Sequence, residues 1–293
     1  MSETCSELIE TTAPSINSEA GENSPSRLQS TSFFALSREA GVRGAGVIEK
    51  PNEIKTPDGA ADGFLIHQEM EGRWPGVLYL TDIIGIRQAS QAMASRLAAE
   101  GYAVLLPNIF YRNGQPPIFN FPLKIGDERF MKRMNEIRGP LTPDAMDRDL
   151  SAYADFLAKQ PGVSGKAFAA VGFCFSGQMA LRAAAARSDQ IAAAASFHGG
   201  GLYTEAPTSP HRLLPRVKAH LYFAHAIEDR SMPQEAIEQF DRALAVWGGN
   251  YESETYEAHH GWTVPDNPWY NERQAERAYK RLTALLSSIL KVN

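Results

Sequence analysis

Short apolar runs alternate along this chain with longer segments in which apolar residues recur every three or four positions. The nearly continuous apolar runs predict strands that are buried on both faces, as in a parallel sheet, and they cover residues 76–80, 102–106, 168–173, 191–197 and 219–224. The periodic segments predict helices with one buried face, over residues 89–97, 146–157, 237–247 and 275–289. Alternating strands and helices predict an α/β protein with a mostly parallel central sheet and helices on both faces.

Turn and capping residues add detail at both ends of this pattern. Residues 53–56 and 63–67 flank the turn Pro57-Asp58-Gly59, which predicts an antiparallel hairpin before the first core strand. Thr142 followed by Pro143 is a typical helix start. Residues 251–256 alternate between apolar and polar side chains, which predicts an outer strand.

Two segments lack regular structure in this pattern. Residues 1–32 are rich in Ser, Thr, Glu and Asn and have few large apolar side chains, so we expect a disordered N-terminal tail. Residues 108–140 mix Gly, Pro, aromatic and charged residues without a clear period, over a length that exceeds a normal connection. We predict a single domain over residues 46–293, with 108–140 as a lid-like excursion over the functional site.

Composition narrows the class of protein and its location. No run approaches the about 18 apolar residues of a membrane-spanning helix. The first residues lack a basic region followed by an apolar core, so we expect no secretory signal. The two cysteines, Cys5 and Cys174, make no disulfide framework. The net charge of −5 comes without a basic stripe. We expect a cytoplasmic protein, monomer or homodimer, that binds neither nucleic acid nor membrane.

The stretch from Phe168 to Ala180 holds the strongest chemical signal. Its first half is the predicted strand and its second half opens an alanine-rich helix, with Cys174 between Gly172 and Ser176. Small residues around a reactive one are typical of a nucleophile elbow, where a strand turns sharply into a helix. The helix N-terminus would bias the thiol toward the thiolate that attacks carbonyl carbon. A buried structural cysteine is the alternative.

Three candidate catalytic residues each closely follow a predicted strand, in the order Cys174, Asp229, His260. Nucleophile, acid and histidine follow each other in this order in α/β-hydrolases, and the carboxyl ends of parallel strands share one edge of the sheet. The imidazole would take the thiol proton and the carboxylate would orient the imidazole. Taken singly, Asp229 could be a capping residue and His260 an ordinary loop histidine.

Other kinds of site find less support. His259 and His260 are adjacent, so their side chains diverge, and no second pair has metal-ligand spacing. No phosphate-binding Gly-x-x-x-x-Gly-Lys motif occurs. Ser176 would be out of register as a nucleophile, inside the helix. We therefore predict neither a metal nor another cofactor.

These motifs resemble those of the dienelactone hydrolase family, which has a cysteine-type α/β-hydrolase fold. The similar segments are residues 172–177, Asp229 with Pro233 after it, residues 260–262, the hairpin with its Pro-Asp-Gly turn, and residues 81–85. The resemblance covers residues 53–290. It implies hydrolysis of a small ester or lactone, as by a carboxymethylenebutenolidase, through a thioester acyl-enzyme.

The resemblance also implies roles for further residues. An acid that contacts the nucleophile falls on Asp82, where the family usually has the longer Glu. The backbone N–H groups of Ile83 and Phe175 would form the oxyanion hole. A substrate-binding arginine falls on Arg112. Its neighbour Tyr111 and the more distant Trp262 are the other expected substrate contacts.

One position departs from the pattern. Enzymes that act on dienelactone have a second arginine four residues after the histidine, where this chain has Val264. We therefore expect a hydrolase of a small ester or lactone without assigning dienelactone itself. The alternatives are a general carboxylesterase or thioesterase, and a hydrolase fold retained for binding without catalysis.

Overall fold

An eight-stranded sheet organises the computed structural model, which describes residues 46–291. The strand order is β1-β2-β4-β3-β5-β6-β7-β8. The strands are β1 (Val47–Thr56), β2 (Gly59–Gln68), β3 (Trp74–Leu80), β4 (Ala103–Pro107), β5 (Val163–Phe173), β6 (Ile191–Phe197), β7 (His220–Ala226) and β8 (Tyr251–Tyr256).

The direction of pairing matches the sequence pattern. β1 and β2 form the predicted antiparallel hairpin, and β2 also pairs antiparallel with β4. All pairings from β4 through β8 are parallel. The central strand β4 is buried throughout and β3 nearly so, which explains their continuous apolar runs. The prediction of a mostly parallel sheet is confirmed.

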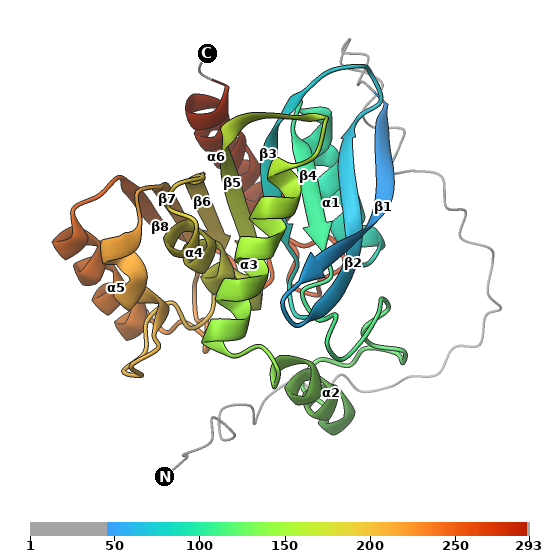
Figure 1. Ribbon diagram of the computed structural model, residues 1–293. Helices are drawn as coiled ribbons and strands as arrows, with labels where there is room; N and C mark the ends of the chain where they lie inside the picture. The colour runs from blue at the N-terminus through green and yellow to red at the C-terminus, as the bar shows by residue number, and fades with distance from the viewer. Residues whose placement is uncertain (1–45, 292–293) are drawn as a thin grey trace. The chain divides into compact units, whose positions relative to one another are not determined.

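Helices cover both faces of the sheet (Figure 1). Buried side chains of α1 and α6 pack with one face, and those of α3, α4 and α5 pack with the other. The α-helices within residues 46–291 are α1 (Gln88–Ala99), α2 (Glu128–Arg138), α3 (Pro143–Ala158), α4 (Gly177–Ala186), α5 (Gln234–Trp247) and α6 (Glu272–Leu290). Two 3₁₀ segments complete the described elements, η1 (Cys174–Ser176) and η2 (Pro210–Arg216). The expected two-sided arrangement is confirmed.

The excursion at 108–140 contains a helix that its sequence did not predict. Helix α2 begins after Asp127, whose carboxylate accepts a hydrogen bond from the backbone N–H of Phe130 at 2.7 Å. Only Phe130 and Ile137 of α2 are buried. Two buried positions are too few to make a visible apolar period, so the capping acid was the only signal for this helix.

The predicted N-terminal tail, residues 1–32, lies outside the described residues. Among the residues that are described, no helix combines the length and apolarity needed to cross a membrane. Parallel strands bring their carboxyl ends to one edge of the sheet, where β5, β6, β7 and β8 each lead directly into a segment with candidate chemistry.

Candidate active site

The turn after β5 has the tight geometry of a nucleophile elbow. The φ angle of Cys174 is +56°, in the left-handed region that strains a residue other than glycine. A Cβ atom on Gly172 would lie 2.1 Å from the carbonyl oxygen of Ser176. A Cβ atom on Gly177 would lie 2.5 Å from the Cα atom of Gly199. Glycine is therefore required on both sides of Cys174.

Ser176 has a structural part in this turn. Its hydroxyl is fully buried and donates a hydrogen bond to the carbonyl oxygen of Leu80 at 2.7 Å. It also accepts a hydrogen bond from the backbone N–H of Phe173 at 2.9 Å. The hydroxyl thus ties the start of α4 to the end of β3. Cys174 is partly exposed, so the thiol rather than this hydroxyl is open to a substrate.

The structure brings His260 and Asp229 to the same place as Cys174. Nδ1 of His260 lies 2.7 Å from Oδ2 of Asp229. Nε2 is the nitrogen left to face Cys174, which interacts electrostatically with the imidazole. Ser231 donates two hydrogen bonds to Oδ1 of Asp229, from its backbone N–H at 2.8 Å and its hydroxyl at 2.6 Å. One hydrogen-bonded chain therefore links Ser231, Asp229 and His260 beside Cys174.

Electrostatics reinforce this chain. Burial alone would lower the pKa of His260, but the electrostatic interaction with Cys174 and the hydrogen bond to Asp229 outweigh burial and raise the pKa well above its ordinary value. Burial alone would raise the pKa of Asp229, yet hydrogen bonds from His260 and Ser231 hold that pKa below its ordinary value. The site therefore favours the charged form of His260 beside the carboxylate of Asp229.

We expect His260→Gln to lower the Tm more at pH 6 than at pH 10. A histidine whose pKa is higher in the folded state stabilises the fold fully below its unfolded-state pKa of about 6.5. That contribution is lost as the pH rises through the raised folded-state pKa. Thermal melts of both proteins at both pH values measure the difference.

The control for this experiment is His259→Gln. His259 is adjacent in sequence but half exposed, and its imidazole is 3.7 Å from the exposed carboxylate of Glu228. We expect its effect on the Tm to change little with pH. If the drop in Tm caused by His260→Gln were larger at pH 10 than at pH 6, the claim that the folded protein favours a protonated His260 would be contradicted.

The loop after β3 presents the expected oxyanion-hole segment. Oδ1 of Asp82 accepts a hydrogen bond from the backbone N–H of Ile84 at 3.0 Å, and its carbonyl oxygen accepts from the N–H of Gly85 at 3.1 Å. This turn fixes the loop on either side of Ile83. Among residues 46–291, no hydrogen bond outside the helices and strands uses the backbone N–H of Ile83 or Phe175. An oxyanion hole formed by these two groups stays a prediction.

The carboxylate of Asp82 has partners other than the thiol. Two nitrogens of Arg87 donate to its two oxygens, each at 2.8 Å. Arg87 in turn binds Asp266 at 2.7 Å. This bidentate pair holds the loop after β3 in place and compensates the charge of Asp82. A contact between Asp82 and Cys174 stays a prediction.

Arg112 and Tyr111 belong to a cluster around a buried carboxylate. Asp149 of α3 is fully buried and accepts hydrogen bonds from Arg112 at 2.6 and 2.9 Å. It also accepts one from the hydroxyl of Tyr111 at 2.9 Å. Arg112 donates a further hydrogen bond to Asp58 of the hairpin turn at 2.6 Å. These partners do not support the predicted substrate contacts, because the polar groups already serve Asp149.

We expect Arg112→Ala to lower the stability by about 3–5 kcal/mol, because removing one partner leaves a buried charge uncompensated. Denaturant unfolding measures this loss. The matched control is Arg148→Ala: Arg148 also binds Asp58, at 2.6 Å, but is half exposed, so we expect a much smaller loss of stability than in the Arg112 variant.

The same variants also test the substrate role of Arg112. If the role of Arg112 is only structural, the Arg112 variant keeps the parent's ratio between kcat/KM for an acidic ester and kcat/KM for a neutral ester. A stable variant with an altered ratio would restore Arg112 as a substrate contact.

Trp262 is a core residue. Its side chain is 0% exposed, and its ring stacks on Tyr256 with 4.4 Å between the ring centroids. Val264, in the place of the family's second arginine, is buried as well. The expected contact between Trp262 and a substrate is therefore not supported, because the packed indole is closed to any ligand. The large apolar ring of Trp262 is buried in the core, although the residue belongs to a recognised motif.

The excursion at 108–140 packs beside the elbow. The ring of Phe110 lies 6.3 Å from that of Phe175, the residue after Cys174. From the other end of the excursion, the guanidinium of Arg138 lies 5.1 Å from the centre of the same Phe175 ring. These two contacts bring both ends of the excursion to the residue that follows Cys174. Its action as a lid stays a prediction.

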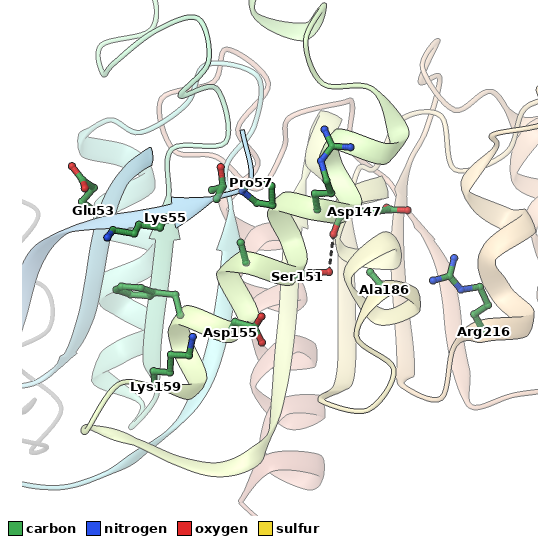
Figure 2. A pocket seen from close by; sticks show the side chains of 13 residues that line it. Glu53, Lys55, Pro57, Asp147, Ser151, Asp155, Lys159, Ala186 and Arg216 are labelled. Carbon is green, nitrogen blue, oxygen red and sulfur yellow. Dashed lines mark hydrogen bonds between the residues drawn. The ribbon is translucent and has the colours of Figure 1, made fainter. Parts of the chain in front are cut away.

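A hollow of about 880 Å³ lies away from these residues. It lies between β1 and α3, with Lys55, Asp147, Ser151 and Asp155 among its lining residues (Figure 2). Neither the elbow nor its partners line it. Within the described part of the chain, no three His, Cys, Asp or Glu side chains gather as metal ligands would.

Sequence reasoning assigned no part to two residues that this site uses, Ser231 and His198. Ser231 follows Asp229 by two positions, a spacing at which a carboxylate accepts the backbone N–H in an Asx turn. That spacing could have identified it. His198 accepts a hydrogen bond from the backbone N–H of Cys174 at 3.2 Å. In the sequence, only its place directly after β6 indicated that His198 could belong to the site.

Comparison with known proteins gives consistent matches. A curated relative from Synechocystis sp., named "Putative carboxymethylenebutenolidase", is 28% identical over 236 residues, covering 78% of this chain and 92% of that protein. The carboxymethylenebutenolidase of Rhodococcus opacus is 26% identical over 198 residues, covering 66% of this chain and 73% of that protein.

A solved structure from Klebsiella pneumoniae, titled "Crystal Structure of Putative Dienelactone Hydrolase", superposes with a TM-score of 0.73 at 21% identity. It covers 83% of this chain and 99% of that one, which confirms the predicted α/β-hydrolase fold. The model of the dienelactone hydrolase family matches residues 61–290. Since this match spans well over half of the sequence, the chain belongs to the dienelactone hydrolase family.

Proposed function

We propose that this protein hydrolyses a small carboxylic ester or lactone with Cys174 as the nucleophile. The observation that carries the proposal is the place of Cys174 at the strained turn after β5, beside the hydrogen-bonded pair of His260 and Asp229. A left-handed backbone at a non-glycine residue costs free energy, and such strain is typical of functional sites.

The reaction follows from the positions of these groups. The thiolate of Cys174 attacks the carbonyl carbon, and the carbonyl oxygen becomes an oxyanion facing the N–H groups of Ile83 and Phe175. The imidazolium of His260 gives the proton on Nε2 to the leaving oxygen as the C–O bond breaks. This leaves a thioester on Cys174 and a neutral imidazole, with an alcohol released from an ester or a tethered hydroxyl from a lactone.

The second half of the reaction reverses these roles. Neutral His260 takes a proton from water while the water oxygen attacks the thioester carbonyl. The C–S bond breaks, the acid product leaves, and the thiolate–imidazolium pair is restored. Asp229 keeps the proton on Nδ1 throughout, because its carboxylate accepts a hydrogen bond from that nitrogen at 2.7 Å.

The test uses the full chain with Cys5→Ala, so that Cys174 is its only thiol. Turnover is measured with p-nitrophenyl acetate, a small lactone and a short-chain thioester, before and after reaction with one equivalent of iodoacetamide. We expect hydrolysis of the ester or lactone, lost in proportion to alkylation. Preference for the thioester would favour a thioesterase. Absence of turnover with all three would favour a binding protein.

A further inference from the structure

His198 is a buried, polar residue that the mechanism above does not use. It follows β6 directly, its side chain is 0% exposed, and its φ angle is +39°. Its backbone N–H donates to the carbonyl oxygen of Ala224 on β7 at 2.7 Å. The backbone hydrogen bond of the sheet could be made by any residue other than proline. The reason for a histidine at this position must therefore lie in the contacts of its ring.

Both ring nitrogens of His198 have a partner, and together they fix one tautomer. Nδ1 lies 3.2 Å from the backbone nitrogen of Cys174, which can only donate, so Nδ1 carries no proton. Nε2 lies 2.7 Å from the hydroxyl oxygen of Thr263 and therefore carries the proton and donates it there. A doubly protonated ring would set an N–H against the N–H of Cys174.

The hydrogen bond to Cys174 lies at the most strained point of the elbow. The N–H belongs to the residue with φ of +56°, and a partly buried N–H without a partner costs free energy. The His198 ring also meets the catalytic imidazole edge-on, with 5.0 Å between the centroids of His198 and His260. One buried ring thus contacts the backbone of the nucleophile and the side chain of its base.

The neutral state of His198 suits this place. Burial lowers the pKa of His198 well below its ordinary value, and the charge of His260 acts in the same direction. Asp229 acts in the opposite direction but does not outweigh these effects. His198 therefore stays an acceptor for Cys174 while His260 is charged.

We propose that His198 is a positioning residue: its Nδ1 holds the backbone N–H of Cys174, which keeps the elbow in the geometry that aims the sulfur at the carbonyl carbon. Thr263 supports this role by fixing the tautomer. The inference rests on the proposed function for its effect on turnover, but the hydrogen bond itself can be tested without turnover.

The experiment compares His198→Asn with His198→Gly in the full chain carrying Cys5→Ala. Asn places an oxygen near the position of Nδ1 and tolerates a positive φ, whereas Gly tolerates the φ but offers no acceptor. We expect the Gly variant to lose about 10- to 100-fold in kcat with KM little changed, because the defect is in aiming the nucleophile. The Asn variant should stay within about fivefold of the parent.

A second measurement separates this inference from the proposed function. The rate constant for alkylation of Cys174 by iodoacetamide should fall in the Gly variant and be preserved in the Asn variant, whether or not any ester is hydrolysed. If the parent lacks turnover but alkylation follows this order, the proposed function fails and the positioning role stands. Equal rates in parent, Asn and Gly variants, or equal losses in both variants, would overturn the positioning role.

Thr263→Val gives a milder test, should the His198 variants fail to fold. Valine removes the hydroxyl that fixes the tautomer and leaves Cys174 and His198 in place. We expect a loss of about three- to tenfold in both kcat and alkylation rate, with KM unchanged. Parent-like values of kcat and alkylation rate in a folded Thr263 variant would overturn the support that we assign to this hydroxyl.

Discussion

Replacement of Cys174 by alanine is expected to lower kcat/KM for p-nitrophenyl acetate by about 10⁴-fold or more. The sulfur is the only partly exposed nucleophile at the elbow, since the nearby hydroxyl of Ser176 is buried and hydrogen-bonded to Leu80. Alanine has nearly the shape of cysteine and meets the same backbone strain, so we expect the fold to survive. The measurement is initial rate against substrate concentration.

The matched control for this variant is Cys5→Ala, which removes the other thiol of the chain. Its kcat/KM should equal that of the parent. Cys174→Ser should keep only a trace of activity, because a hydroxyl needs a stronger base than a thiol does. Activity of the alanine variant within tenfold of the parent would remove Cys174 from the reaction.

The second large effect is expected from Asp229→Asn, which should lower kcat by about 10²- to 10⁴-fold. The carboxylate accepts from His260 on one oxygen and twice from Ser231 on the other. The Ser231 N–H can only donate, so the asparagine oxygen will keep that bond and the amide nitrogen will face Nδ1. The imidazole must then carry its proton on Nε2 and cannot accept the thiol proton there.

Glu228→Gln is the control for this change. Glu228 adjoins Asp229, but its exposed carboxylate faces His259 at 3.7 Å rather than His260. We expect kcat within twofold of the parent. The Asn variant should also have a lower pKa of His260 than the parent, since the hydrogen bond that His260 donates to Asp229 is one cause of the raised pKa. Equal kcat values in the Asn and Gln variants would show that Asp229 does not orient the base.

The fold was predictable because its signal is apolar and regular. The run 191–197 became β6 with the expected bounds, and residues 251–256 became β8. Helix α3 begins at Pro143 after a Thr142 cap, as its first residues indicated. Helix α2 escaped prediction because only two of its residues, Phe130 and Ile137, are buried, so its pattern lacks a wide apolar face.

The site was predictable only where chemistry and position coincide. Cys174, Asp229 and His260 follow β5, β7 and β8, and parallel strands necessarily bring such residues to one edge. Partnerships that depend on packing were not predictable. Arg112 could not be assigned to Asp149 without knowing that α3 buries this carboxylate beside it. Trp262 follows the histidine in a recognised motif, but Tyr256 and the core decide where its ring lies.

The most direct test of the central claim is to trap the acyl-enzyme. The full chain with Cys5→Ala is mixed with p-nitrophenyl acetate, quenched in acid within the first turnover, digested and analysed by mass spectrometry. We predict an acetyl group on the peptide that contains Cys174, removed by neutral hydroxylamine as a thioester is, and absent from Cys174→Ala. An acetyl group on another residue, or first-turnover product without any acyl-enzyme, would contradict a reaction that passes through Cys174.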